Sequence, residues 1–537
     1  MQVYRLSGDD VREYLLSDLA HNRIITILRV AFWSTLILSI LWLIYFAIVT
    51  IRMPYPIEYR EGAAPVMTQF FLKGENPFSL ENQPLGTNNY GFVYNLVVLP
   101  FAALFGNTLL VHRTVTFFFI LLSCLLIFQT TFRVNSDRFF ALAGAVLMMM
   151  GLATRGGLGA YPTAMGVFLF LAGILIPFNR NFDTLSLSLS AILCIMAFYT
   201  KPYFVVSFGI VASYLFIFIS KRKGLFYCLL FGIPFALSYL LVRYFLLLYF
   251  IDIFVSNLSN THQDFFMFTI YQIVEFAIEF SPALILGVIL LFFNIKMPHL
   301  KGVSLKRFLR FLDISSLDRP LVSISISYIT YFFICSLLTF ILILGRHTGT
   351  FMTYLNQILL PPFFLLLFQY IKPLTRLALI SCFLVLLNIV SFAQVRFNPL
   401  FLQQTDSKDW AGLYQSIGNS RYILNSPVLI SEMVRLRIPP LDSGQTQYFY
   451  TIDPFPDNKL LGPNYQIVRN VGLQYQETIR QSVIDAKYDK IYLTPLLKNF
   501  LVPDDMRRYY YRTNTFVVNM PQADQNLIVE SWEPIPK

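Results

Sequence analysis

The chain has 537 residues, of which 56% are hydrophobic and only 13% are charged, and its formal net charge is +11. A soluble domain carries about 25% charged residues, so this composition excludes an ordinary soluble globular protein and also a disordered one. The five cysteines all lie in apolar stretches, which excludes a disulfide scaffold, and no cysteine or histidine spacing indicates a zinc site.

The positive charge is unevenly distributed along the chain. Residues 1–395 hold 26 Lys or Arg and 16 Asp or Glu, whereas residues 396–537 hold 15 and 14. The excess therefore lies in short segments between apolar stretches, where the preference of basic residues for the cytoplasmic side of a membrane accounts for it. Because the chain shows no basic stripe and no nucleic-acid-binding motif, we expect no nucleic acid partner.

Eleven apolar stretches are long enough to cross a bilayer when their ends extend into the flanking residues. They cover approximately residues 30–51, 114–132, 139–153, 162–178, 185–200, 203–219, 225–250, 271–294, 321–344, 351–371 and 374–394. The first is too long for the apolar core of a signal peptide and lacks a small-residue cleavage site, so it is predicted to be an uncleaved anchor. The sequence thus predicts a polytopic, all-α membrane protein.

A twelfth apolar stretch, residues 91–107, decides the topology. The basic segments 1–24, 220–224 and 296–320 are all expected on the cytoplasmic side. Successive spans place all three segments on the cytoplasmic side only if residues 91–107 do not cross the membrane. We therefore predict that this stretch forms a juxtamembrane helix at the outer face. The N-terminus is then cytoplasmic and residues 396–537 are extracytoplasmic. The alternative, with twelve spans and an outer N-terminus, contradicts the charge of the N-terminal segment.

The composition changes abruptly near residue 396, after which no long apolar stretch follows. Segments 406–419 and 477–488 have a helical pattern, whereas segments 427–432, 490–495, 515–520 and 526–531 have the pattern of strands. This alternation predicts a small α/β domain. The chain therefore divides into a membrane module over residues 1–395, with a first outer loop at 52–113, and an outer domain over residues 396–537.

Polar residues gather on the predicted outer side, whereas the interiors of the spans are nearly free of charge. Arg243 is the most deeply placed charged residue, and it either lines a lipid-phosphate pocket or extends to the interface. A transporter usually carries ionisable residues within its spans, so this distribution favours chemistry at the outer face. Glu58 and Glu61 in the first outer loop are three residues apart, share a helix face and are candidate general bases.

Short patterns distributed along most of the chain resemble one family in their order and topology. The matching segments are Arg60-Glu61-Gly62, Leu72 to Phe78, Tyr90 with Tyr94, Phe105-Gly106, His112-Arg113, residues 161–166, Thr200-Lys201-Pro202, residues 345–349 followed by Tyr354 and Asn356, and residues 428–432 and 487–493. Together they resemble the GT-C glycosyltransferases, membrane enzymes that take a sugar from a polyprenyl phosphate. The greatest similarity is to bacterial relatives of protein O-mannosyltransferases and to the lipid A aminoarabinose transferase.

The resemblance implies roles for individual residues. It makes Glu61 the expected catalytic base, with Glu58 as the second choice. It implies that Lys201, Arg346 and His347 stabilise the negative charge of the donor phosphate. It also suggests that Tyr90 and Tyr94 contact the sugar or the prenyl chain, although aromatic residues also anchor helices at membrane interfaces.

Two positions depart from the family pattern. Arg60 stands where the family has the first acid of a pair, and Thr163 stands where many relatives have an Asp. Divalent metal ions prefer several oxygen ligands, so we expect no cofactor and a transfer that needs no metal. Glu275 and Glu279, four residues apart, are either replacement ligands or part of a solvated helix face.

The resemblance implies an inverting transfer of a monosaccharide from a polyprenyl-phosphate donor to an acceptor hydroxyl. The reaction is expected at the outer face of the plasma (inner) membrane, with an envelope glycan, lipid or protein as acceptor and membrane lipid as a further partner. Two alternatives remain open. One is an O-antigen polymerase or ligase that uses polyprenyl-diphosphate glycans. The other is a lipid or solute transporter.

Overall fold

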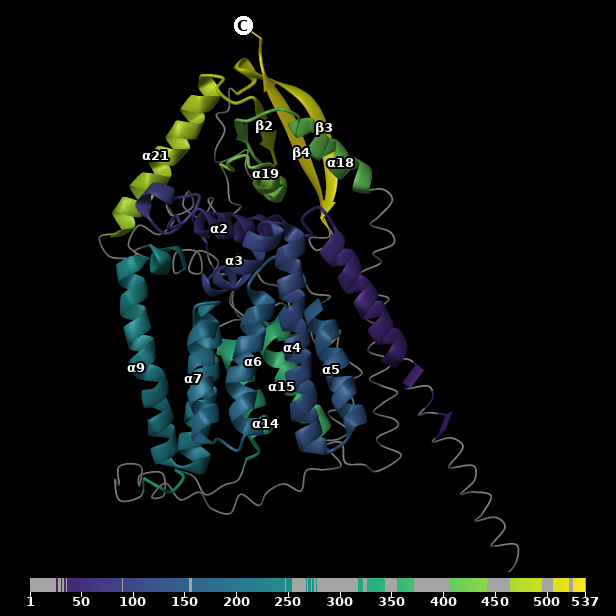
Figure 1. Cartoon of the computed structure of the whole chain (residues 1–537), viewed down its shortest axis with the longest axis vertical. Helices are drawn as coiled ribbons and strands as arrows, with labels where there is room; N and C mark the ends of the chain where they lie inside the picture. Colours follow the sequence, from purple (N-terminus) through teal and green to yellow (C-terminus); the bar gives the residue numbers. More distant parts are fainter. Residues whose placement is uncertain are drawn as a thin grey trace, which may run out of the picture.

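The computed structural model of the chain shows a bundle of helices with a smaller α/β domain stacked on one end (Figure 1). It describes residues 36–88, 90–153, 157–246, 248–253, 317–321, 326–342, 355–370, 406–441, 464–494, 506–520 and 525–536, with isolated positions between 26 and 34 and between 267 and 277. The predictions for residues 271–294 and 374–394 lie almost entirely outside these ranges.

The bundle is formed by the helices that the apolar stretches predicted. They are a first helix at Leu36–Arg52, α4 (Leu109–Asn135), α5 (Arg138–Leu152), α6 (Thr163–Asn179), α7 (Thr184–Phe198), α8 (Val206–Tyr214) with the π-helical turn η5 (Leu215–Ile219), α9 (Lys221–Phe245), α14 (Tyr328–Leu342), and α15 (Leu360–Tyr370) after the π-helical turn η10 (Leu355–Leu359). The predicted helical character of these segments is confirmed.

The predicted number of about eleven membrane spans is not supported. Within the described ranges, three helical segments are long and apolar enough to cross a membrane: Leu109–Asn135, Pro202–Ile219 and Lys221–Phe245. The other apolar helices have 10–17 residues. A 15-residue helix such as α5 is about 22 Å long, which is shorter than the roughly 30 Å hydrocarbon core.

Polar capping residues explain why several helices begin where they do. The side chain of Thr108 accepts a hydrogen bond from the amide of Val111 at the start of α4. Asp137 caps α5 in the same way, and Asp183 caps α7. A side-chain oxygen at this position satisfies an amide that has no partner within the helix. These caps divide the apolar sequence into helices of unequal length.

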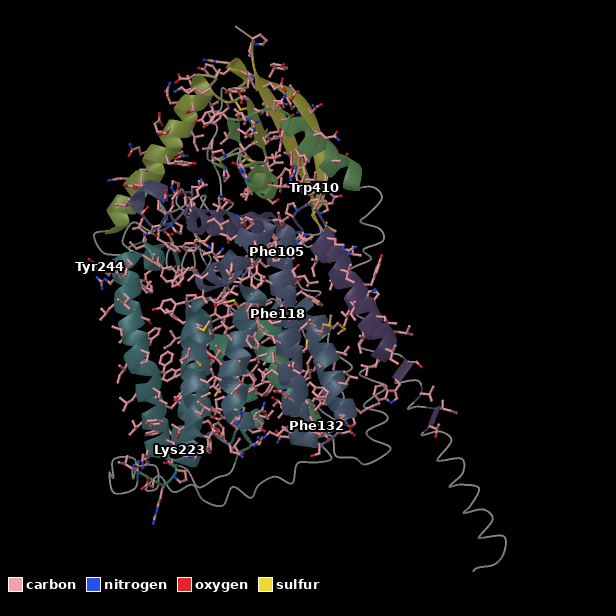
Figure 2. All side chains as sticks on the ribbon, viewed as in Figure 1. Phe105, Phe118, Phe132, Lys223, Tyr244 and Trp410 are labelled. Carbon is pink, nitrogen blue, oxygen red and sulfur yellow. The ribbon has the colours of Figure 1, made fainter. Side chains whose placement is uncertain are left out.

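The two ends of the bundle differ in charge. In Figure 2, Phe132 near the end of α4 and Lys223 near the start of α9 lie at the end away from the α/β domain. Arg133 donates hydrogen bonds to the carbonyl of Asn179 and to the side chain of Asn181, which ties α4 to the end of α6. We call this end, which carries Arg133, Arg138, Arg180 and Lys223, the basic end, and the opposite end the site end.

Two further helices, α2 (Ala63–Leu72) and α3 (Val93–Phe105), lie across the site end of the bundle (Figure 1). The side-chain amide of Asn95 on α3 donates to the carbonyl of Ala64 at 2.8 Å and to Oγ1 of Thr68 at 2.9 Å, which joins the two helices. The stretch 91–107 therefore forms a short helix that lies between the bundle and the α/β domain.

In its described residues, the α/β domain contains a four-stranded sheet in the order β1-β2-β4-β3. Its elements are α18 (Asp406–Ile417), β1 (Ile423–Leu424), α19 (Ile430–Leu436), α21 (Asn464–Ile484), β2 (Lys490–Leu493), β3 (Tyr510–Met520) and β4 (Gln525–Pro534). β1 pairs with β2 in parallel, and β4 pairs antiparallel with both β2 and β3. Three of the four predicted strands are thus confirmed.

The predicted strand at 427–432 is wrong. Residues Pro427–Leu429 form a 3₁₀ turn, and α19 follows directly. The proline suits the first turn of a helix because the missing amide hydrogen has no helical partner there. Ile430, Met433 and Val434 are all buried, and their spacing of three and four residues is that of a helix face, which a short apolar run conceals.

Candidate functional site

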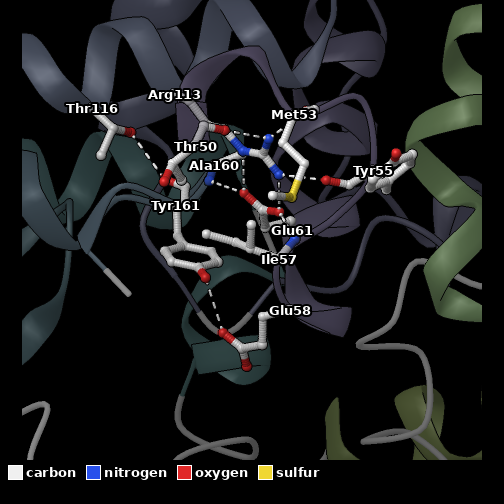
Figure 3. Close-up of polar contacts among 11 residues, drawn as sticks. Thr50, Met53, Tyr55, Ile57, Glu58, Glu61, Arg113, Thr116, Ala160 and Tyr161 are labelled. Carbon is white, nitrogen blue, oxygen red and sulfur yellow. Dashed lines mark hydrogen bonds and ion pairs between the residues drawn. The ribbon is translucent and has the colours of Figure 1, made fainter. Parts of the chain in front are cut away.

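A buried ion pair joins the loop after the first helix to α4 (Figure 3). Glu61, in the 3₁₀ turn η1 (Tyr59–Gly62), lies 2.6 Å from Nη2 of Arg113 on α4. Both side chains are completely buried. A charged pair in this position is stable only when the remaining hydrogen-bonding groups are also satisfied.

The surrounding backbone satisfies both partners. The five N–H groups of the Arg113 guanidinium make five hydrogen bonds: two to the Glu61 carboxylate and three to the carbonyls of Thr50, Met53 and Tyr55. Glu61 also accepts hydrogen bonds from the amides of Ile57 at 2.6 Å and Ala160 at 2.7 Å. Glu61 is therefore held as a structural residue that connects the first helix, the loop that follows it, α4 and the chain before α6.

Glu58 is placed differently from Glu61. It lies just before η1, has 7% of its surface exposed, and its Oε2 accepts a hydrogen bond from the hydroxyl of Tyr161 at 3.0 Å (Figure 3). Tyr161 directly follows Ala160, whose amide is bonded to Glu61. The ion pair thus fixes the backbone on both sides of the Glu58–Tyr161 contact.

Lys201 lies at the site end of α7, just before the 3₁₀ turn η4 (Pro202–Val205). Its Nζ donates to Oγ1 of Thr163 at 2.7 Å, and it lies 4.8 Å from the ring centre of Tyr90 and 5.9 Å from that of Tyr203. An ammonium group beside aromatic faces is stabilised by the negative charge of the rings. A positive charge is therefore held in an aromatic setting with 7% of the residue exposed.

The carboxylate of Glu58 and the ammonium group of Lys201 both have hydrogen-bond partners at the start of α6. Tyr161, the partner of Glu58, and Thr163, the partner of Lys201, are two residues apart at the beginning of this helix. The family resemblance assigned Glu58 and Lys201 to one site, but these contacts with Tyr161 and Thr163 could not be predicted, because they join segments far apart in the sequence. A carboxylate and an ammonium group therefore each form a hydrogen bond with the same short segment, residues 161–163.

The loop that carries Tyr90 is fixed by a close backbone contact. The amide of Gly91 donates to the carbonyl of Thr200 at 2.9 Å. A β-carbon on residue 91 would lie 1.6 Å from the carbonyl oxygen of Tyr199, so only glycine fits. This contact places Tyr90 against Lys201.

The other predicted site residues have different positions. Tyr94 is completely buried, and its hydroxyl donates to the carbonyl of His112 and shares a hydrogen bond with Thr116. This environment makes Tyr94 part of the packing between α3 and α4 and leaves it no surface for a sugar. Arg346 and His347 lie outside the described residues, as do Glu275 and Glu279. In the described part of the chain, no three His, Cys, Asp or Glu side chains are grouped so that they could hold a metal ion.

Two residues at the site end were missed by the sequence reasoning. Gln357, in the π-helical turn η10, accepts a hydrogen bond from the hydroxyl of Tyr203. Asp252 is buried and accepts a hydrogen bond from the side chain of Gln83 at 3.1 Å. The available signal for Asp252 was its position as an acidic residue within the apolar run 248–254. Nothing in the sequence distinguished Gln357, because π-helical turns have no sequence pattern, although they are frequent at functional sites.

Asp252 provides a prediction about pH. Burial raises the pKa of its carboxyl group well above the usual range. The folded protein keeps this proton to a higher pH than the unfolded chain, which loses it above about pH 4, so the folding stability contributed by Asp252 falls as the pH rises. Asp252→Asn should therefore be more stable than the wild type at about pH 8, with no difference below about pH 4. Thermal unfolding across this pH range tests the prediction, and a constant difference would contradict it.

Comparisons of the chain with known protein families, with characterised proteins and with solved structures gave no match.

Proposed function

We propose that the protein is an integral membrane glycosyltransferase that moves a monosaccharide from a polyprenyl phosphate to an acceptor hydroxyl. The observation that supports this proposal is that Glu58 and Lys201 form hydrogen bonds with Tyr161 and Thr163, which are two positions apart at the start of α6. A sugar phosphate needs a cation at the phosphate, and a carboxylate can accept the proton of the attacking hydroxyl. The resemblance to the GT-C family specifies the kind of donor.

Glu58 is the proposed general base, in place of Glu61. Both oxygens of Glu61 already accept hydrogen bonds from Arg113 and from backbone amides, so accepting a proton would break the buried ion pair. Glu58 is bonded to a tyrosine hydroxyl and lies at the edge of the same loop. In the proposed step, Glu58 takes the proton of the acceptor hydroxyl as its oxygen attacks C1. The bond from C1 to the phosphate oxygen breaks, polyprenyl phosphate leaves, and the configuration at C1 is inverted.

Lys201 is the proposed partner of the donor phosphate. Its ammonium group is held by Thr163 and two aromatic rings, so it is positioned before a ligand binds. Charge that develops on a leaving phosphate is stabilised by a fixed cation with little reorganisation. Tyr90, which packs on Lys201, is the proposed contact for the sugar or the first prenyl units. Arg346 and His347 remain proposed further cations.

The proposed membrane arrangement includes the shorter helices as spans. α4 runs from the site end to the basic end and α9 runs back, and α5, α6 and α7 lie between these ends (Figures 1 and 2). We place the basic end in the cytoplasm because lysine and arginine favour that side. The site end and the α/β domain then face the outside of the plasma membrane, and α2 and α3 lie at the outer interface. No metal or cofactor is required in this proposal.

A screen of donors tests the proposed function. Purified protein is incubated with a panel of polyprenyl-phosphate sugars and an envelope extract that supplies acceptors. Mass spectrometry then follows the release of free polyprenyl phosphate and the transfer of the sugar. Release from one donor, together with a glycosylated acceptor, is the expected result. Release only from a polyprenyl-diphosphate glycan would instead identify a polymerase or ligase, and movement of unmodified lipid across vesicles would identify a transporter.

Lys201→Met provides a quantitative prediction for donor binding. The KM for the donor should rise by about tenfold to a hundredfold, because a hydrogen bond to a charged group contributes about 1.5–3 kcal/mol. Lys201→Arg keeps the charge and should recover part of the affinity. Lys73→Met, which removes an exposed lysine at the end of α2, is the matched control and should behave as the wild type. An unchanged KM in Lys201→Met would remove Lys201 from the site.

A further inference from the structure

The α/β domain is in direct contact with the loop that carries Glu58 and Glu61. Tyr55, six residues before Glu61, stacks on Trp410 of α18 with the ring centres 5.3 Å apart and the planes 8° from parallel. Tyr55 also makes an edge contact with Tyr414 at 6.4 Å. In Figure 3, Tyr55 lies beside the green ribbon of the α/β domain. A residue of the first loop thus completes the core of the C-terminal domain around Trp410.

A second contact lies on the other side of Glu61. A β-carbon added to Gly62 would lie 2.6 Å from both Cβ and Cδ1 of Ile430, the first residue of α19. The backbone of Gly62 has an ordinary right-handed helical conformation, so glycine is required here for space and not for its backbone freedom. The side chains of Val66 and Phe70 on α2 continue this contact and form a buried apolar cluster with Ile430 and Val434.

The backbone connects both contacts to the ion pair. The carbonyl of Tyr55 accepts a hydrogen bond from Nη2 of Arg113, whose same nitrogen contacts Glu61. Gly62 directly follows Glu61 in the turn η1. The segment from Tyr55 to Gly62, which includes Glu58, is therefore held between α4 on one side and the α/β domain on the other.

We infer that Trp410 and Ile430 of the C-terminal domain are positioning residues for Glu58. Tyr55 and Gly62 are the two ends of the eight-residue segment 55–62 that contains Glu58, and both contact the α/β domain, Tyr55 at Trp410 and Gly62 at Ile430. The domain is thus a structural part of the site. The contribution of the α/β domain to catalysis rests on the proposed function. Its contribution to the order of residues 55–62 does not.

Gly62→Ala tests this inference in the full-length protein. The methyl group would separate η1 from α19, so the amides of residues 55–62 should exchange hydrogen faster in hydrogen–deuterium exchange. The rate of sugar transfer should fall by about tenfold to a hundredfold through kcat, with a smaller change in KM, because small misplacements of catalytic groups have large effects. Gly412→Ala is the matched control in the same domain, since its β-carbon would lie at an ordinary 3.6 Å from Phe516.

Compensating variants separate a local clash from general damage. Ile430→Gly removes the atoms that the alanine would meet, so Gly62→Ala with Ile430→Gly should exchange more slowly at residues 55–62 than Gly62→Ala alone and should recover part of kcat. Tyr55→Phe keeps the stacked ring and should resemble the wild type, whereas Tyr55→Leu should loosen the same segment without introducing a clash.

The results distinguish this inference from the proposed function. Unchanged exchange at residues 55–62 in Gly62→Ala and Tyr55→Leu would overturn the inference, even in an active transferase. Equal loosening of the whole α/β domain by Gly62→Ala and Gly412→Ala would also overturn it. A protein that shows the expected changes in hydrogen exchange at residues 55–62 but transfers no sugar would support the ordering of this loop by the α/β domain. It would overturn both the role of this ordering in catalysis and the proposed function.

Discussion

Glu58→Gln is expected to lower the rate of sugar transfer by about a hundredfold to ten-thousandfold, the usual contribution of a general base. Glutamine keeps an oxygen that can accept the hydrogen bond from Tyr161 but cannot take a proton at neutral pH. The fold and the affinity for the donor should therefore be preserved. Steady-state kinetics with free polyprenyl phosphate as the product measure the effect.

Two controls make the Glu58 result specific. Glu75→Gln changes an exposed acid in the same loop and should leave the rate unchanged. Tyr161→Phe removes only the hydroxyl that donates to Glu58, so it should cause a smaller loss than Glu58→Gln. A Glu58→Gln protein that turns over at the wild-type rate would show that another group accepts the proton.

Arg113→Met is expected to destabilise the protein by about 3–5 kcal/mol, the cost of leaving a buried charge without its partner. It removes all five hydrogen bonds of the guanidinium and leaves Glu61 and three backbone carbonyls without these donors. The effect should be visible as a lower yield of folded protein and a lower Tm in detergent. Sugar-transfer activity should fall in proportion to the amount of folded protein.

A paired variant separates the charge from the packing at this site. Glu61→Gln with Arg113→Met removes both charges, so it should recover part of the stability that Arg113→Met loses. Recovery should be incomplete because the carbonyls of Thr50, Met53 and Tyr55 still lack donors. Arg222→Ala, which breaks an exposed pair with Asp318, is the control and should leave Tm unchanged. A stable Arg113→Met protein would contradict the structural role of the ion pair.

The sequence predicted the secondary structure of the bundle well because apolar composition determines where its helices form. Its count of about eleven spans is not supported, since three helical segments in the described part of the chain are long enough to cross a membrane and the helices capped by Asp137 and Asp183 have only 15 residues. The strand predicted at 427–432 failed for a related reason. A short apolar run fits a strand or a buried helix equally well until its neighbours are known.

The candidate site could be predicted only in part. Sequence spacing identified Glu58 and Glu61 as a pair and left open which of them reacts. The difference between them depends on Arg113, 52 residues after Glu61, and on the amide of Ala160, 99 residues after it. Lys201 was identified from the family resemblance, but its contacts with Thr163 and Tyr90 depend on how α6 and the loop before α3 meet. Such long-range contacts leave no periodic pattern in a single sequence.

A structure of the full-length protein with polyprenyl phosphate bound would test whether Glu58 and Lys201 belong to one active site. We expect the phosphate within hydrogen-bonding distance of Nζ of Lys201, at the start of α6, with Glu58 on the side where a sugar would be attached. The Glu61–Arg113 pair should remain intact in that structure. A phosphate bound at the basic end, near Arg133 and Lys223, would contradict the assignment of Lys201 and Glu58 to the active site. A lipid that contacts neither residue would contradict it as well.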